Sequence, residues 1–284
     1  MSVSSATMAK ETVAFVLGGG GVRGGYEVGK LKALLEAGIV PDLVLGTSIG
    51  SVQGAFVAAD PSPGCVDRLN NLWIDVMRQK IFRPSLTSRL STLAVTGTHM
   101  CSNKPIADLL VRYLGRPRIQ DLAVPFECVA ASIERASAHW FATGPLIPAV
   151  LASCAVPGVW PPVRIGDEHF LDGGLVESIP LHRAYELGAT TVYVLHAGRV
   201  NKALRPPRRP WEIASVSFEI ARRHRFSEGM ANVPEGVTVH LLPTGDTAPD
   251  EDIDIFDSTE DQIEEVRTRV ANAYAATAEY LRAV

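Results

Sequence analysis

The sequence has 284 residues, of which 46% are hydrophobic and 20% are charged, and these proportions exclude a disordered chain, a collagen-like chain and a small disulfide framework. A chain of this length can bury a large core, so we expect one domain over residues 1–284. The formal net charge of −4 offers no general attraction to phosphate backbones, which argues against a nucleic-acid partner.

The cysteines and the apolar segments argue against two further classes of protein. Cys65, Cys101, Cys128 and Cys154 are far apart and form no C-x-x-C pair, which argues against a zinc site and fits buried thiols in a reducing compartment. The first residues have no signal-peptide pattern, and no segment contains the roughly 18 uninterrupted apolar residues that a membrane span needs. We therefore expect a soluble, cytoplasmic protein that holds no metal.

Predicted strands and helices alternate along the chain. Strands are predicted at residues 12–17, 43–46, 126–132, 139–143, 163–172 (a hairpin that turns at Gly166 and Asp167), 190–198 and 236–243. Helices are predicted at residues 25–38, 47–59, 66–78, 105–113, from 145, at 178–188, and from Asp257 to the C-terminus. This alternation is typical of an α/β fold with a mainly parallel central sheet and helices on both faces, which binds ligands at the carboxyl ends of its strands.

Two segments have no clear period. Residues 82–102 contain serine, threonine and scattered apolar residues, and we expect a loop or mobile flap there. Residues 199–225 are rich in arginine and proline. We favour a solvated arginine-rich loop, and the alternative is a basic surface that attracts the protein to anionic membranes.

The sequence Gly-Thr-Ser-Ile-Gly at residues 46–50 leaves a predicted strand and opens a predicted helix. A serine flanked by glycines in such a sharp turn is typical of a nucleophile elbow. The N-terminus of the following helix would present unpaired N–H groups and a positive dipole to a developing oxyanion. The simpler alternative is a tight turn in which Ser48 only caps the helix.

Four consecutive glycines follow the first predicted strand. Gly19, Gly21 and Gly24 satisfy the dinucleotide fingerprint G-x-G-x-x-G, but that fingerprint expects an acidic residue at the end of the second strand, where this chain has Ser48. We therefore favour an oxyanion hole beside Ser48 over a cofactor site, because the first two strands of such sheets are often neighbours. Arg23 either braces this loop or approaches a substrate head group.

A nucleophilic serine needs a base. Asp172 ends a predicted strand before two glycines, so it should lie at the same edge of the sheet as Ser48. An ordinary aspartate is a weak base, with a pKa near 3.9, but burial would raise that pKa and a hydrogen bond to the serine would orient the proton transfer. The alternative is that Asp-Gly-Gly simply turns the chain.

The histidines offer a competing triad of the α/β-hydrolase type, in the order Ser, Asp, His. His182 falls at a predicted helix start and His240 inside a predicted strand, so His196, at the end of a strand, is the one candidate at the expected edge. Because Ser48 follows only one strand–helix unit, we regard this triad as a minority hypothesis.

Together the three turns resemble the patatin-like phospholipase family, whose members hydrolyse lipid acyl esters with a serine–aspartate dyad. The resemblance covers residues 12–200 and implies a three-layer α/β/α fold, with residues 201–284 as a C-terminal extension packed on the same domain. It implies that Ser48 is the nucleophile and that Asp172 is the base. It also assigns the oxyanion hole to Gly19, Gly20 and Gly21, and motif positions to Arg23, Gly24, Gly46, Gly50, Gly173 and Gly174.

The resemblance implies two-step acyl transfer on a lipid or acyl-ester substrate, without a metal or organic cofactor. A peripheral contact with a membrane is a further expectation. The competing interpretation is a non-catalytic or dinucleotide-binding protein that uses the same glycine loop. The sequence leaves the oligomeric state open.

Overall fold

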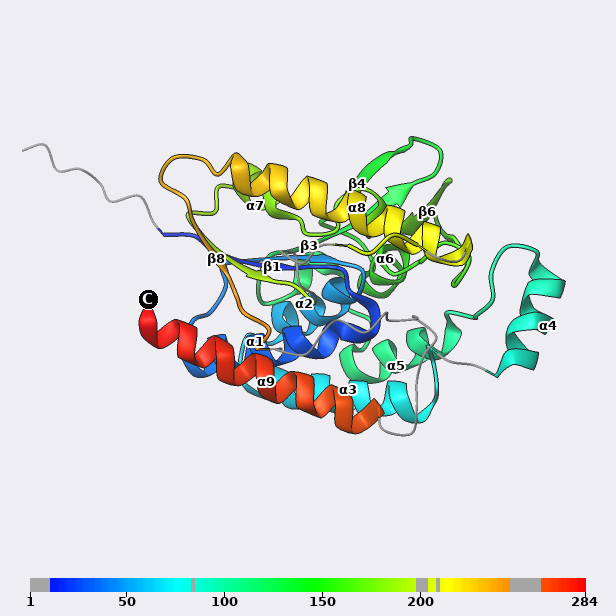
Figure 1. Ribbon diagram of the computed structural model, residues 1–284, viewed down its shortest axis with the longest axis horizontal. Helices are drawn as coiled ribbons and strands as arrows, with labels where there is room; N and C mark the ends of the chain where they lie inside the picture. Colours follow the sequence, from blue (N-terminus) through cyan, green and yellow to red (C-terminus); the bar gives the residue numbers. More distant parts are fainter. Residues whose placement is uncertain (1–10, 83–84, 198–203, 208–209, 246–261) are drawn as a thin grey trace, which may run out of the picture.

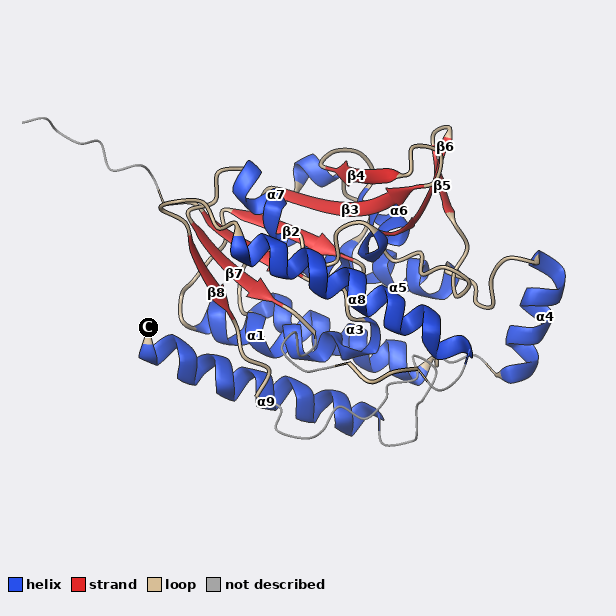
Figure 2. Cartoon of the chain, turned by 45° about the horizontal axis from the view of Figure 1, so that its top comes forward, coloured by secondary structure: helices blue, strands red, loops and turns tan. Residues whose placement is uncertain are grey.

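A central sheet organises the protein (Figures 1 and 2). The structure, a computed structural model, describes residues 11–82, 85–197, 204–207, 210–245 and 262–284. Within these ranges the sheet has eight strands. They are β1 (Val13–Leu17), β2 (Leu43–Thr47), β3 (Phe126–Ser132), β4 (Ser137–Phe141), β5 (Val163–Ile165), β6 (Glu168–Asp172), β7 (Thr191–Leu195) and β8 (Thr238–Leu241).

The strand order is β5-β6-β3-β2-β1-β7-β8, with β4 paired to β3. Strands β3, β2, β1, β7 and β8 are parallel to their neighbours in this order, whereas β4 and β6 run antiparallel to β3, and β5 runs antiparallel to β6. The hairpin predicted at Gly166 and Asp167 is present between β5 and β6. The predicted mainly parallel sheet is therefore confirmed, with antiparallel pairing confined to the end that carries Asp172.

Helices cover both faces of the sheet, as predicted (Figure 1). They are α1 (Gly25–Glu36), α2 (Ile49–Ala59), α3 (Gly64–Arg78), α4 (Leu86–Thr96), α5 (Lys104–Leu114), α6 (Leu146–Ser153), α7 (Leu181–Glu186), α8 (Pro210–Ala231) and α9 (Gln262–Ala283). Helices α7 and α8 lie on one face, and α1, α3 and α9 lie on the other. No helix in the described ranges is long and apolar enough to cross a bilayer.

The side chains of β1 show why this strand reads as a continuous apolar run. Ala14 and Val16 point into a cluster with α7 and α8, whereas Phe15 and Leu17 point into the larger cluster on the opposite face. Because successive side chains of a strand alternate between faces, a strand covered on both sides needs apolar residues at every position. This burial fixes β1 at the centre of the sheet.

Helix α1 is buried along most of its length, because α9 packs along it on the side away from the sheet. Gly29 allows this contact: a Cβ atom there would lie 2.2 Å from the carbonyl oxygen of Val270. Val266 of α9 is buried against this region. The start predicted for the last helix, at Asp257, lies outside the described residues.

The expectation of a loop or flap at residues 82–102 is wrong for residues 86–96, which form α4. The Oγ of Ser85 accepts a hydrogen bond from the N–H of Ser88, and Gly97 ends the helix with a φ of +71°. The many hydroxyl residues between the leucines concealed this helical period.

The expectation of a solvated loop at residues 199–225 is wrong for the part from Pro210 onward, which belongs to α8. Arg222 is buried and donates to the Glu219 carboxylate over 2.7 Å, and Arg225 donates to the carbonyl of Leu175. These two arginines therefore bond within the protein, from a helix that covers one face of the sheet. Residues 198–203 and 208–209 lie outside the described ranges.

Replacing Gly29 with alanine should destabilise the protein by about 2 kcal/mol or more, because the new Cβ would force α9 away from α1. Equilibrium urea unfolding measures this effect as a lower midpoint. Gly64→Ala at the start of α3 is the matched control, since the nearest atom would lie 3.4 Å from its Cβ. Equal midpoints for the two variants would contradict the close packing of α9 on α1.

Candidate active site

Ser48 occupies a sharp turn between β2 and α2, with φ of 53° and ψ of −124°. The flanking glycines are needed for close packing: a Cβ on Gly46 would lie 2.6 Å from the carbonyl oxygen of Gly50, and one on Gly50 would lie 2.4 Å from that of Leu17. The positive φ of a non-glycine residue costs on the order of 1 kcal/mol and is typical of functional turns. The local chain therefore holds Ser48 in the geometry of a nucleophile elbow.

The Ser48 side chain does not cap α2. Its hydroxyl Oγ instead donates a hydrogen bond to Oδ2 of Asp172, 2.6 Å away. Both residues are buried, and Asp172 is 2% exposed. The alternative in which Ser48 serves only as a helix cap is therefore wrong.

Strand β3 brings these two residues together. Thr47, the last residue of β2, pairs with Val129, and Asp172, the last residue of β6, pairs with the next residue of β3, Ala130. Because β2 is parallel and β6 antiparallel to β3, the two strands run toward each other on either side of β3. Their carboxyl ends therefore lie at neighbouring residues of β3. Gly173 follows without a side chain, since a Cβ there would lie 2.1 Å from the Val129 carbonyl oxygen.

Asp172 is held by three hydrogen bonds. Its Oδ1 accepts from the N–H of Gly174 over 2.7 Å, its Oδ2 accepts from Ser48, and its own N–H donates to the carbonyl of Ala155. Burial raises the pKa of Asp172 to about 6, against the opposing effect of the two bonds to its carboxylate. The carboxylate is therefore ionised at neutral pH and is a stronger base than an exposed aspartate.

Two further serines fix the turn, and the sequence motifs did not reveal either. The N–H of Ser48 donates to Oγ of Ser153 on α6 over 2.9 Å, and Oγ of Ser51 donates to the carbonyl of Ser48 over 2.6 Å. Ser153 and Ser51 are fully buried. For Ser153, the one available signal in the sequence was a hydroxyl residue within the largely apolar helix predicted from residue 145.

The glycine loop lies directly beside Ser48. A Cβ on Gly19 would be 3.5 Å from the Ser48 Cβ, and one on Gly20 would be 2.1 Å from the Cβ of Ala197. The N–H groups of Gly18 and Gly19 donate to the carbonyls of Leu195 and Ser178. In the described part of the chain no hydrogen bond occupies the N–H of Gly20 or Gly21.

The far end of this loop is anchored on α2 and α3. The side-chain amide of Gln53 donates to the Gly24 carbonyl over 2.8 Å, and a Cβ on Gly24 would lie 2.6 Å from the ring of Trp73. Arg23 belongs to the short 3-10 helix Gly21–Gly24. These contacts position the loop, and no sequence motif indicated a role for Gln53.

Comparison with known proteins decides the family. The model of the patatin-like phospholipase family matches residues 15–185, which is more than half of the chain. This chain belongs to the patatin-like phospholipase family. The resemblance seen in the three turns is thereby confirmed.

Relatives with this domain are much longer proteins. The chain is 31% identical over 198 residues to lysophospholipase nte1 of Aspergillus niger, covering 67% of this chain and 12% of that protein. It is 35% identical over 189 residues to patatin-like phospholipase domain-containing protein 6 of Homo sapiens, covering 66% and 13% respectively. The crystal structure of VipD from Legionella pneumophila shares the fold, with a TM-score of 0.51 at 16% identity, over 97% of this chain and 67% of that one.

His196 and His240 of this patatin-like chain bond to groups other than the pair. His196 is buried and its carbonyl accepts a hydrogen bond from Nζ of Lys30. Nδ1 of His240 is 2.9 Å from the hydroxyl of Tyr280. Among the described residues, no histidine forms a hydrogen bond with Ser48 or Asp172. A triad through His196 therefore receives no geometric support.

A buried ionisable pair lies beneath the glycine loop of the patatin-like fold. Glu27 and Lys30, one turn apart on α1, are both fully buried. Burial raises the pKa of Glu27 well above its usual range and lowers the pKa of Lys30 to about 7. Lys30 ties α1 to the strand end at His196. The sequence pattern that predicts a helix at residues 25–38 does not indicate that these charged residues are internal.

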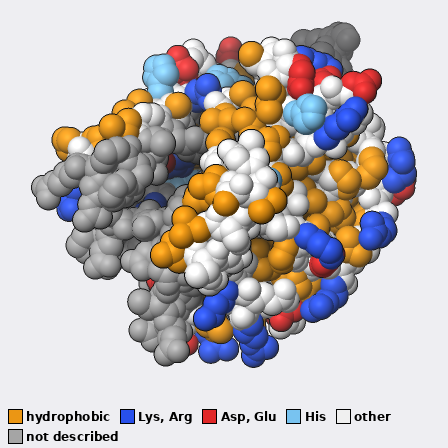
Figure 3. Space-filling model, turned by 90° about the vertical axis from the view of Figure 1, so that its right-hand side faces the viewer, with side chains coloured by type: hydrophobic (Ala, Val, Ile, Leu, Met, Phe, Trp, Pro, Cys, Tyr) orange, Lys and Arg blue, Asp and Glu red, His pale blue; other side chains and the backbone are white. Residues whose placement is uncertain are grey.

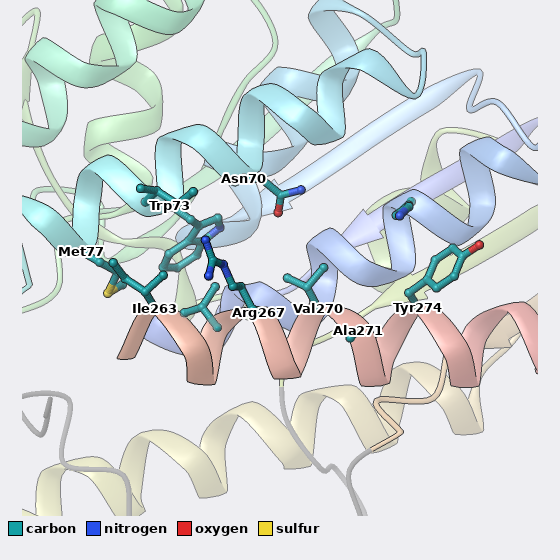
Figure 4. Close-up of a pocket in the computed structure, with 11 residues that line it drawn as sticks. Asn70, Trp73, Met77, Ile263, Arg267, Val270, Ala271 and Tyr274 are labelled. Atoms are coloured by element: carbon teal, nitrogen blue, oxygen red, sulfur yellow. The ribbon is translucent and has the colours of Figure 1, made fainter. Parts of the chain in front are cut away.

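An apolar groove of about 380 Å³ lies between α3 and α9 (Figure 4). Its lining includes Trp73, Met77, Ile263, Val266 and Val270, and it contains neither Ser48 nor Asp172. Trp73 connects this groove to the glycine loop through its contact at Gly24. The part of the chain that the structure describes contains no cluster of three or more His, Cys, Asp or Glu side chains placed to hold a metal ion.

Asp172→Asn should stabilise the protein at pH 8 and lose this advantage as the pH falls toward 4. The folded-state pKa of Asp172 is raised from its ordinary 3.8 to about 6, so ionisation above pH 6 favours the unfolded state by about 3 kcal/mol. Thermal unfolding at pH 8 and pH 4 measures the difference. Asp167→Asn in the exposed hairpin is the control, and a pH-independent effect at residue 172 would contradict the raised pKa.

Proposed function

We propose that this chain is a serine acyl hydrolase that cleaves lipid acyl esters through a Ser48–Asp172 dyad. The reaction is of the phospholipase A, lysophospholipase or lipid esterase type. The hydrogen bond of 2.6 Å from Ser48 Oγ to the buried Asp172 carboxylate is the observation that carries this proposal. Membership of the patatin-like phospholipase family supports it.

In the first step, Asp172 Oδ2 takes the proton of the Ser48 hydroxyl while Oγ attacks the ester carbonyl carbon. The tetrahedral intermediate then collapses, the ester C–O bond breaks, and the proton passes from Asp172 to the leaving alcohol. The acyl group remains on Ser48 as an ester. The raised pKa of Asp172 favours both proton transfers, because a carboxyl group with a pKa of about 6 can accept a proton and return it at neutral pH.

In the second step, water attacks the acyl-enzyme carbonyl and gives a proton to Asp172. Collapse of this intermediate breaks the bond to Ser48 Oγ, which regains the proton from Asp172, and the fatty acid leaves. The same two residues therefore act in both halves of the reaction, and the balance of atoms requires only water as co-substrate.

The oxyanion of both intermediates would lie against the glycine loop. We assign its stabilisation to the N–H groups of Gly20 and Gly21, beside Ser48. The Gly19 N–H already donates to Ser178, so we propose that Gly19 holds the loop and joins the oxyanion hole only when this bond opens. Loss of one such donor typically costs about a hundredfold or more in rate.

The substrate that this site favours is a lipid or other acyl ester. One relative is named a lysophospholipase, and this chain spans only 12% of that protein, so the assignment rests on the site as much as on the relative. We propose that the protein acts in the cytoplasm and reaches its substrate by peripheral contact with a membrane.

Ser48→Ala should abolish covalent labelling by an alkyl fluorophosphonate and lower ester hydrolysis by about ten-thousandfold or more. Intact mass shows the adduct, and a soluble short-chain nitrophenyl ester reports turnover. Ser137→Ala, on the exposed strand β4, is the control and should label like the wild type. Adducts on the Ser48→Ala protein would place the nucleophile elsewhere.

The pH dependence of kcat/KM should report the ionisation of Asp172. Activity should fall about tenfold per pH unit below pH 6, because only the ionised carboxylate accepts the Ser48 proton. Asp172→Asn should remove turnover, whereas His196→Gln should keep both activity and this acid limb. A loss of activity in His196→Gln protein that folds normally would favour a triad.

A further inference from the structure

Helix α4 presents an apolar stripe that nothing in the described structure covers. None of its residues is buried. Leu86, Leu90 and Leu93 follow one another at i, i+4 and i+7 and are 63%, 57% and 40% exposed, and Val95 is 86% exposed. Figure 1 shows α4 standing apart from the rest of the protein. Exposed leucines at helical spacing are typical of an interaction surface.

The polar face of α4 carries hydroxyl groups with very little charge. Its polar residues are Thr87, Ser88, Arg89, Ser91, Thr92 and Thr96. A helix of eleven residues is too short to span a bilayer but can lie in the plane of its interface with the leucines facing the acyl chains. The composition therefore matches an interfacial helix better than a helix that pairs with a charged protein surface.

The sequence around α4 is basic, although the whole chain has a net charge of −4. No aspartate or glutamate occurs between Asp75 and Asp108. The same stretch contains Arg78, Lys80, Arg83, Arg89 and Lys104, of which Lys104 pairs with Asp108. Figure 3, which faces this end of the molecule, shows hydrophobic side chains over a broad area with Lys and Arg side chains nearby. This local charge is complementary to an anionic lipid surface.

The segments that flank α4 contact the region next to Asp172. Before the helix, the ring of Phe82 lies 5.6 Å from that of Trp160. After it, the N–H groups of Met100 and Cys101 donate to the carbonyls of Gly158 and Val159. The arrows of β2 and β7 in Figure 2 point toward the end that carries α4. A partner bound to α4 would therefore lie next to the edge of the sheet that carries Ser48.

We propose that α4, with the basic residues on both sides of it, is the docking surface by which this protein binds an anionic lipid bilayer. The proposal deepens the proposed hydrolase function and names the surface that brings Ser48 to its substrate. The leucines enter the interface, and the flanking lysines and arginines contact the lipid head groups. The membrane contact is thus located at α4 and not at the arginines of α8, of which Arg222 and Arg223 bond to Glu219.

Vesicle binding tests the proposal directly. Ser48→Ala protein, which should leave the lipids intact, is sedimented with vesicles of phosphatidylcholine and about one-third phosphatidylserine. Adding Leu86→Ser and Leu90→Ser should weaken binding about tenfold or more, because interfacial affinity scales with buried apolar area. The matched control carries Val40→Ser and Leu187→Ser, which are also exposed but precede β2 and β7 at the opposite edge of the sheet. The control should bind like its parent.

Charge substitutions test the contribution of the basic residues beside α4. Arg78→Glu with Lys80→Glu, both at exposed positions, should weaken binding to the phosphatidylserine vesicles and leave the weaker binding to pure phosphatidylcholine vesicles nearly unchanged. Raised salt should have the same effect as the charge change. Equal loss on both kinds of vesicle would overturn the charge complementarity.

Hydrolysis separates this proposal from the proposed function. In protein that retains Ser48, the Leu86→Ser and Leu90→Ser changes should lower turnover on vesicles and leave turnover of a soluble short-chain ester unchanged. Altered soluble-ester turnover with unchanged vesicle binding would make α4 a cover over the site and overturn docking. A change only in oligomeric state on size-exclusion chromatography would assign the stripe to a second copy. Wild-type turnover of the soluble ester without vesicle binding would overturn docking and leave the hydrolase intact.

Discussion

The hydrogen bond between Ser48 and Asp172 joins residues 124 positions apart, and much of the fold serves to place these two side chains. Neither strand that carries them could do so alone. Strand β3 pairs with β2 through Val129 and with β6 through Ala130, so its register determines how far apart the two strand ends lie. A slip of one residue in either pairing would turn the side chains at that strand end to the other face of the sheet. The antiparallel strand β6 at this end of the sheet therefore places Asp172 beside Ser48.

Several features near Ser48 and Asp172 oppose stability. Ser48 adopts a positive φ, Asp172 carries a charge in a buried position, and Glu27 and Lys30 are both internal. Each of these is costly unless the surrounding contacts hold it in place. The apolar clusters on both faces of the sheet supply such contacts, together with the bonds from Gly174 and Ser153. The buried centre of the sheet therefore supports the strained and charged groups at its carboxyl edge.

The sequence predicted the framework and the three turns because these depend on local patterns. Strand β1 is apolar at each position, and the turn at Ser48 needs glycines at fixed spacing. Features that depend on distant partners escaped prediction. Lys30 is internal because its ammonium bonds to the carbonyl of His196, 166 residues later, and Ser153 reaches the Ser48 amide from a helix more than 100 residues away. Helix α4 was missed because its leucines are diluted by serine and threonine, which favour turns in other contexts.

The packing of α9 links the end of the chain to the glycine loop near its beginning. Arg269 donates to the carbonyl of Val22, 247 residues earlier, and Gly25 lies against Val266. The family match ends at residue 185, before Leu195, whose carbonyl holds the Gly18 amide. An expression fragment cut at the limits of that match would contain every recognisable motif and lack all three of these contacts with the loop and the start of α1. The boundaries of recognisable sequence and those of a working unit are different in this protein.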